Sequence, residues 1–203
     1  DLHSFPTRRS SDLTSGTDLY PLLATADYLR HEIAGDDVTF INNCNINFTN
    51  ICTVRCGFCA FGKDAGDPEA YILNDEQILT KAQGAVEKGA HEFCLMGGVL
   101  PDADIEYYEH LLRLLKGEYP NVMIHGFSPT MINDACTVSG INIAEGCERL
   151  CDAGLDTLPG TAAEILTDRS REIICPEKVN VQEWIDIVKT AHEVGIPGSA
   201  TIM

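Results

Sequence analysis

The chain has 203 residues, of which 44% are hydrophobic and 22% are charged. A chain of this length can bury a hydrophobic core as one domain, and no apolar run approaches the ~18 residues needed to cross a bilayer. Thirty-one acidic against 14 basic residues give a formal net charge of −17, which repels the phosphates of nucleic acids and anionic lipids. We therefore expect a globular protein that binds neither nucleic acids nor membranes.

The first residues do not read as part of a fold. Residues 1–13, DLHSFPTRRSSDL, show neither helical nor strand periodicity. They resemble translated sequencing-adapter tails, so we interpret residues 1–16 as a non-native or disordered leader. Residues 17–203 are expected to form a single domain, with no sign of a second one.

Strand-like and helix-like segments alternate along the rest of the chain. Asn74 followed by Gln77, and Asn180 followed by Glu183, are typical of helix N-termini, and Ser128 before Pro129 is a third such start. The expected strands cover residues 37–43, 45–48, 91–96, 122–127, 155–158 and 196–203. The expected helices cover residues 74–88, 104–116, 143–153 and 180–194, with one more beginning at Ser128.

This alternation predicts an α/β protein built from about five βα units with parallel strands. An eight-unit barrel typically needs ~250 residues, and the chain ends within an apolar, strand-like segment. We therefore expect a partial (β/α) TIM-type barrel, truncated at the C-terminal side.

Nine cysteines cannot all pair in disulfides, and three of them, Cys52, Cys56 and Cys59, lie within eight residues. The N-terminus shows no apolar signal-peptide core, which favours a reducing, cytoplasmic location. Three thiolates directly after an expected strand are suited to an iron–sulfur cluster that keeps one iron open to a further ligand. A structural zinc site would need a fourth ligand at similar spacing, and the nearest extra candidate, Cys44, lies on the preceding strand.

Residues 52–59, with Phe58 before the last cysteine, resemble the C-x3-C-x-aromatic-C signature of the radical S-adenosylmethionine superfamily. The resemblance implies that Cys52, Cys56 and Cys59 hold a 4Fe-4S cluster and that Phe58 lies in the cofactor site. It also implies S-adenosylmethionine as cofactor, cleaved after one-electron reduction to a 5′-deoxyadenosyl radical. Gly97 and Gly98, one βα unit later, match the turn that receives the methionyl amino group.

The wider sequence resembles one branch of the deazaflavin (FO) synthase family over residues 37–203. The segments that carry this resemblance are NINFTN (45–50), CAF (59–61), GGVLP (97–101), HGFSP (125–129) and PGTAAEIL (159–166). The resemblance implies a transferase that forms a carbon–carbon bond between the 4-hydroxybenzyl group of L-tyrosine and 5-amino-6-(D-ribitylamino)uracil. It further implies an electron donor and, as a candidate partner, a second deazaflavin synthase subunit.

Other functions stay open at this point. Aminofutalosine synthase and the dehypoxanthine futalosine cyclase of menaquinone synthesis share the Cys59-Ala60-Phe61 context. An iron–sulfur electron carrier is a non-enzyme alternative, although a carrier normally closes its cluster with a fourth cysteine. A zinc module that binds a partner would be far smaller than five βα units.

His125 and Ser128 are the candidate catalytic residues, because they lie at the C-terminal end of the strand expected at residues 122–127, the end where barrels place their active sites. The alternative is that Ser128 only caps its helix and His125 packs under a loop. Cys147 and Cys151 share one helix face, which core packing explains better than a second metal site. With an incomplete barrel, we expect the 203-residue chain to aggregate, or to cleave S-adenosylmethionine without forming the adduct.

Overall fold

The computed structural model describes residues 16–203, so nearly all of the expected leader lies outside the described residues. The chain divides into two compact units, residues 1–40 and residues 41–203. In the first unit, a short 3-10 helix (η2, Gly16–Asp18) continues into α1 (Leu19–Ala34), which buries none of its side chains. This helix is absent from the elements expected above.

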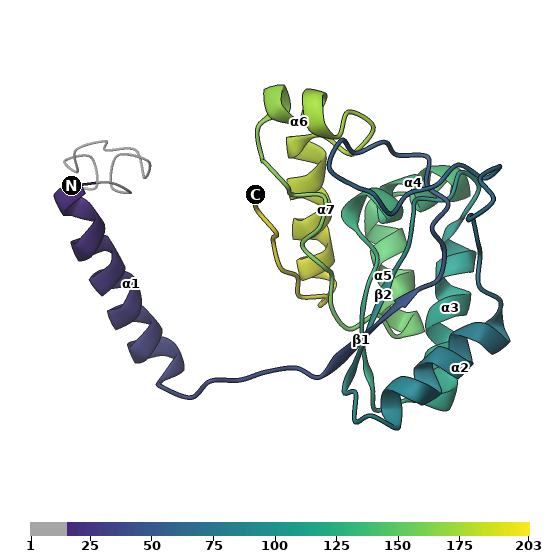
Figure 1. The fold of residues 1–203 in the computed structure, drawn as a ribbon, viewed down its shortest axis with the longest axis horizontal. Helices are drawn as coiled ribbons and strands as arrows, with labels where there is room; N and C mark the ends of the chain where they lie inside the picture. Colours follow the sequence, from purple (N-terminus) through teal and green to yellow (C-terminus); the bar gives the residue numbers. More distant parts are fainter. Residues whose placement is uncertain (1–15) are drawn as a thin grey trace. The chain divides into compact units, whose positions relative to one another are not determined.

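In the second unit, residues 41–203, three strands alternate with helices, and a run of helices follows the third strand (Figure 1). In chain order its elements are β1 (Asn43–Asn47), α2 (Asp75–Val86), β2 (Glu92–Met96), α3 (Ile105–Glu118), β3 (Met123–Gly126), α4 (Pro129–Ser139), α5 (Ile143–Ala153), α6 (Asp168–Ile174) and α7 (Val181–Glu193). No helix within residues 16–203 combines the length and the apolarity needed to span a membrane.

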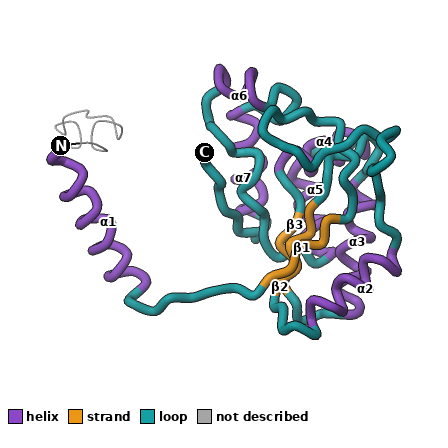
Figure 2. Tube along the Cα trace, viewed as in Figure 1, coloured by secondary structure: helices purple, strands orange, loops and turns teal. Residues whose placement is uncertain are grey.

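The strands form one parallel sheet in the order β1-β2-β3 (Figure 2). Single parallel bridges continue it, from His125 to Thr157 and from Leu158 to Gly198. The expected α/β fold with parallel strands is therefore confirmed. The strands expected at residues 155–158 and 196–203 are wrong as full strands, because only single bridges form there.

Two further differences concern the limits of elements. The strand expected at residues 37–43 is wrong, because residues 37–42 are exposed and strand pairing begins only at Asn43. Helix α6 was not expected, since its seven residues are too few to show a helical period. The three expected helix starts are confirmed: the side chains of Asn74, Ser128 and Asn180 each accept a hydrogen bond from the third residue of their helix.

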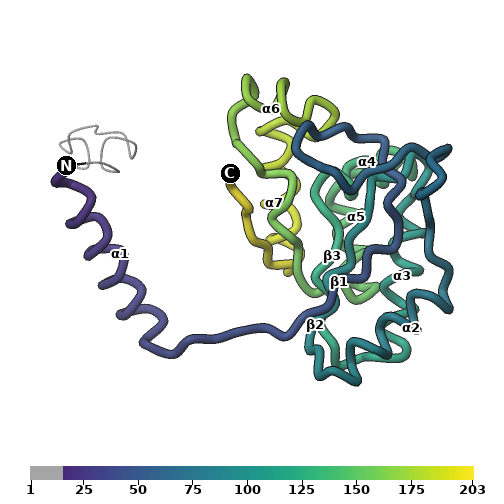
Figure 3. Tube along the Cα trace, in the orientation of Figure 1, coloured from purple at the N-terminus to yellow at the C-terminus, as the bar shows by residue number. Residues whose placement is uncertain are grey.

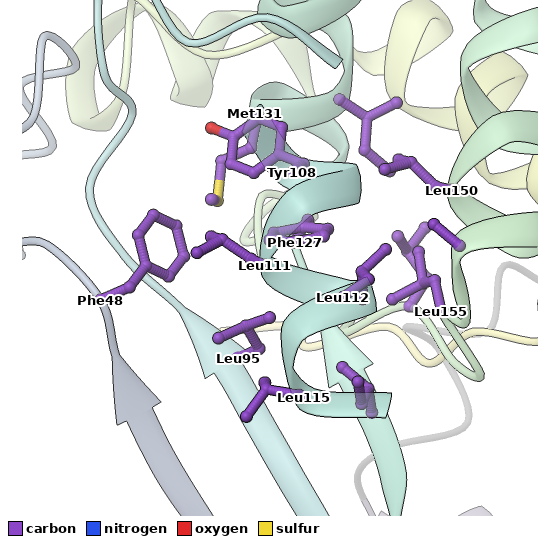
Figure 4. Close-up of a cluster of buried hydrophobic side chains, with 14 of the residues drawn as sticks. Phe48, Leu95, Tyr108, Leu111, Leu112, Leu115, Phe127, Met131, Leu150 and Leu155 are labelled. Carbon is purple, nitrogen blue, oxygen red and sulfur yellow. The ribbon is translucent and has the colours of Figure 1, made fainter. Parts of the chain in front are cut away.

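Helices cover one face of the sheet, and the main hydrophobic core lies between these helices and the sheet. Ile46, Leu95 and Ile124 point to this face and are fully buried. Figure 4 shows the side chains of α3, among them Leu111 and Leu112, packed against this layer. Burying each Leu or Ile stabilises the fold by roughly 1.5–3 kcal/mol. The packed side chains therefore hold the three strands, and with them the loops that follow the strands, in place against α3.

The opposite face of the sheet carries polar side chains. Asn45, Cys94, His125 and Thr157 are neighbours in register across successive strands. Asn45 is exposed, and the other three are partly buried. In a (β/α) barrel this face forms the interior, beneath the loops that follow the strands.

Candidate functional site

The three clustered cysteines lie in a loop after β1, which we call the cysteine loop (residues 52–59). Figure 3 shows the chain leaving β1 and running through a long loop before α2 begins. The amide of Cys52 donates to the carbonyl of Lys63 at 3.0 Å, and the amide of Cys59 donates to the carbonyl of Cys56 at 3.1 Å. Cys52 and Cys56 are partly buried, whereas Cys59 is exposed.

Gly97 and Gly98 form a glycine turn after β2, in direct contact with the chain that leads into the cysteine loop. The amide of Gly98 donates to the carbonyl of Thr49 at 3.0 Å. A Cβ added at Gly98 would lie 2.1 Å from the carbonyl oxygen of Ile51 and 2.8 Å from the Cβ of Cys52. Only glycine fits such an approach. Both motifs therefore follow the C-terminal ends of the neighbouring parallel strands β1 and β2.

One cavity of about 220 Å³ joins these parts. Its walls include all three cysteines of the loop and the glycine turn, together with side chains that follow β3 and the Leu158 bridge. The lining residues outside the two motifs include Met96, Ser128, Thr130, Thr161, Glu164 and Lys178. The cavity therefore gathers segments that are far apart in the sequence.

Two hydroxyl groups in this cavity have no hydrogen-bond partner among the described residues. They are the Oγ1 atoms of Thr130, a residue only 1% exposed, and of Thr161. A buried hydroxyl that stays unpaired costs about 1–3 kcal/mol. Such groups indicate a polar ligand or water in the cavity. No sequence signal marks these threonines, because threonine is common in first helical turns and loops.

The loop after Leu158 has an unusual backbone on the cavity side. Ala162 and Glu164 adopt positive φ angles of 70° and 47°, in the region that favours glycine. Arg171, which is 3% exposed, donates to the carbonyls of Ala162 and Ala163 at 2.7 and 2.8 Å and also to that of Val179. This buried guanidinium fixes the loop, and backbone strain held in this way is typical of functional sites.

A second segment holds the cysteine loop from outside, and we call it the clamp segment (residues 171–179). The amide of Gly57 donates to the carbonyl of Ile174 at 2.7 Å, and the amide of Arg55 donates to Oε2 of Glu177 at 3.2 Å. In Figure 3 this part of the chain lies beside the cysteine loop. The sequence did not reveal the clamp segment, because its contacts span more than a hundred residues.

Burial and charge act in opposite directions on Cys56. Its partly buried position raises the pKa of the thiol to about 11, and the nearby ammonium of Lys178 pulls the pKa down. Thiols bind metals as thiolates, so the binding of a metal by Cys56 must release the proton of its thiol.

The two candidate catalytic residues occupy different places. Ser128 lines the cavity, and its Oγ also accepts a hydrogen bond from the amide of Met131 at 3.3 Å, so it caps α4 as well. His125 lies on the polar face of the sheet, with Nδ1 2.6 Å from the Oγ1 of Thr157, and does not line this cavity. Burial lowers the pKa of His125 below its usual 6.5.

The second cysteine pair belongs to the core. Cys147 is fully buried, and the partly buried Cys151 packs against the same cluster. Core packing is therefore confirmed for both residues.

Comparison with known families and proteins agrees with this arrangement. The family model of the Radical SAM superfamily matches residues 46–203, which include the cysteine loop, the glycine turn and the clamp segment. The chain belongs to the radical SAM superfamily. The matched range, residues 46–203, includes every residue that lines the 220 Å³ cavity.

Curated relatives show a closer similarity. The chain is 47% identical over 189 residues to 5-amino-6-(D-ribitylamino)uracil–L-tyrosine 4-hydroxyphenyl transferase of Methanothermobacter thermautotrophicus, covering 93% of this chain and 52% of that protein. It is 46% identical over 185 residues to the protein of the same name from Nostoc sp., covering 89% and 47%. The chain thus spans about half the length of the curated relatives it matches.

Solved structures share the radical SAM fold. The chain aligns with methylornithine synthase (PylB) at a TM-score of 0.67 and 19% identity, over 96% of this chain and 55% of that one. It aligns with the FeFe-hydrogenase maturase HydG of Carboxydothermus hydrogenoformans at a TM-score of 0.65 and 20% identity, over 90% and 40%. These similarities support the partial barrel expected from the sequence.

The superfamily implies a 4Fe-4S cluster and S-adenosylmethionine, and the chemistry of the residues that line the cavity suits both. It offers three thiols as soft ligands, a glycine turn that leaves room against the loop, and two unpaired hydroxyls. Within residues 16–203, no three His, Cys, Asp or Glu side chains gather closely enough to hold a single metal ion.

Proposed function

We propose that Cys52, Cys56 and Cys59 bind a 4Fe-4S cluster, and that Phe58, Gly97 and Gly98 form part of the adjoining S-adenosylmethionine site. The observation that carries this proposal is the single cavity lined by all of these residues. A closed structural site would surround its metal with protein ligands, whereas here the three thiols face a cavity large enough for a further ligand.

The chain's own residues have distinct tasks in this site. The thiolates of Cys52, Cys56 and Cys59 hold the cluster, and the absence of a side chain at Gly98 keeps the ligand close to the loop. Thr130 and Thr161 line the same cavity, and we expect their unpaired hydroxyls to turn toward the polar groups of S-adenosylmethionine. When bound, the cluster supplies one electron that cleaves S-adenosylmethionine to a 5′-deoxyadenosyl radical. The apolar side chain of Met96, which lines the cavity, helps to keep water away from the radical.

We further propose that the whole protein transfers the 4-hydroxybenzyl group of L-tyrosine to 5-amino-6-(D-ribitylamino)uracil. The names of the relatives at 46–47% identity support these substrates. An electron donor for the cluster and a second deazaflavin synthase subunit are the proposed protein partners. His125 would contact substrate from the polar face of the sheet, through the Nε2 atom that its bond to Thr157 leaves available.

We propose a reducing, cytoplasmic setting for this chemistry. All nine cysteines are free thiols in the structure, as a reducing compartment requires. An iron–sulfur cluster with an exposed ligand such as Cys59 would also be short-lived under oxidising conditions.

The cluster proposal is tested by anaerobic reconstitution followed by iron and sulfide analysis. The unsubstituted chain should bind about four irons, and Cys56→Ser and Cys59→Ser should each lose the intact cluster. Cys147→Ser is the matched control, because this buried thiol packs in the core and should leave the iron content unchanged. Four irons retained in Cys56→Ser but lost in Cys147→Ser would overturn the ligand assignment.

The substrate proposal needs a separate assay. The chain would be extended with the C-terminal half of the Methanothermobacter relative and supplied with tyrosine and the ribityl-diaminouracil, or with menaquinone precursors. We expect adduct formation from tyrosine in the extended protein, and S-adenosylmethionine cleavage without adduct in the 203-residue chain. Turnover of only the menaquinone precursors would overturn the substrate assignment.

A further inference from the structure

Lys178 is a nearly buried cation beside the cysteine loop. Its Nζ lies 5.4 Å from the centroid of the Phe58 ring and 2.7 Å from Oε1 of Glu164. The side chains of Lys178 and Glu164 are only 13% and 9% exposed, and both residues line the same cavity as the three cysteines. In the sequence, Phe58 lies between Cys56 and Cys59.

The position of Lys178 is fixed by more than this ion pair. Lys178 belongs to the clamp segment, which is hydrogen-bonded to the cysteine loop at Gly57 and Arg55. Since the ammonium is largely removed from water, its field is weakly screened and reaches further than that of a surface lysine. The ammonium of Lys178 lies 5.4 Å from the ring centroid of Phe58, which belongs to the cysteine loop. A fixed, poorly screened charge so close to the loop acts on any group that the loop holds.

We propose that Lys178 is a positioning residue that raises the reduction potential of the cluster held by Cys52, Cys56 and Cys59. This inference rests on the proposed function, because it requires the cluster. Reduction transfers one electron from an external donor to the cluster, which gains one negative charge while no bond forms or breaks and no proton moves. A nearby positive charge stabilises the reduced state more than the oxidised state, and net charge is one determinant of such potentials.

Glu164 acts in the opposite direction. Its carboxylate offsets part of the field of Lys178, and the pair together sets the local charge. Removing the ammonium alone leaves a negative charge near the cluster, whereas removing the carboxylate charge alone leaves a positive one. The two substitutions must therefore shift the potential in opposite directions.

The test is a redox titration of the reconstituted chain, followed by electron paramagnetic resonance in the absence of S-adenosylmethionine. In Lys178→Met, the ratio of reduced to oxidised cluster at a fixed solution potential should fall at least tenfold, which corresponds to about 59 mV for one electron. Lys178→Arg should restore the unsubstituted potential, and Glu164→Gln should raise it. Lys189→Met, on the exposed side of α7, is the matched control and should change nothing.

The outcomes separate this inference from the proposed function. Failure of the unsubstituted chain to bind about four irons would refute the proposed function. A full iron content in Lys178→Met with an unchanged potential would refute only the role of Lys178. If Lys178→Met fails to fold because Glu164 is left unpaired, Glu164→Gln decides: a raised potential supports the proposal, and an unchanged one overturns it.

Discussion

The backbone amide of Val99 donates a hydrogen bond to the Sγ of Cys52, with 3.3 Å between the nitrogen and the sulfur. The amide of Thr53 returns a bond to the carbonyl of Val99 at 2.9 Å. The cysteine loop and the turn after β2 are therefore joined by bonds in both directions. These bonds hold the sulfur of Cys52 in a defined orientation beside the turn.

Gly98→Ala should disrupt the cysteine loop. Its new Cβ would lie 2.1 Å from the carbonyl oxygen of Ile51, so backbone must move. Overpacking of this kind costs roughly 1–3 kcal/mol, and we expect lower iron retention as well as a lower unfolding midpoint. Gly84→Ala in α2 is the control, because nothing lies within 4 Å of its added Cβ. Unchanged stability and iron content in Gly98→Ala would contradict the close approach seen here.

Asp156→Ala should weaken the end of the sheet opposite the cavity. Oδ2 of Asp156 accepts hydrogen bonds from the amide of Ile124 and from Nζ of Lys116, both at 2.7 Å. Removing the carboxylate takes this partner from the amide of Ile124 and leaves the ammonium of Lys116 with the carbonyl of Val122, which we expect to cost about 1–3 kcal/mol in urea unfolding. The exposed Asp152→Ala in α5 should change stability by less than about 0.5 kcal/mol. Equal effects of the two substitutions would refute this role of Asp156.

Glu109 should make the free energy of unfolding depend on pH. Hydrogen bonds from Arg149 at 3.1 and 2.6 Å hold the pKa of Glu109 below its ordinary 4.5. Its stabilising contribution is therefore fully present above pH 4.5 and is lost as the pH falls through the lower, folded-state pKa.

Thermal unfolding at a series of pH values measures this contribution. Above pH 4.5, Glu109→Gln should unfold at a lower temperature than the unsubstituted chain, and the difference should shrink as the pH falls below 4.5. The exposed Glu148→Gln provides the control and should show little difference at any pH. A difference for Glu109→Gln that is independent of pH would contradict the ion pair with Arg149.

Local patterns in the sequence predicted much of the fold. The capping residues Asn74 and Asn180 start their helices as expected, because such signals act within four residues. The alternation of strands and helices predicted the parallel sheet, and parallel order in turn placed Gly98 beside the cysteine loop. Strand limits were less predictable, since pairing depends on a partner strand elsewhere in the chain.

The remaining parts of the site depend on long-range contacts. The hydroxyl of Thr130 is significant only because the fold buries it without a partner. Lys178 reads as an ordinary surface lysine in the sequence, and its importance comes from the contacts of the clamp segment with Gly57 and Phe58. No periodicity or motif encodes such contacts.

The most direct measurement is the electron paramagnetic resonance spectrum of the reduced, reconstituted chain with and without S-adenosylmethionine. If three thiols and a glycine turn share one cavity as described, the cluster keeps one iron open and the cofactor binds against it. We expect about four irons per chain and a spectrum that changes when S-adenosylmethionine is added. A cluster whose spectrum is the same with and without S-adenosylmethionine would contradict the account.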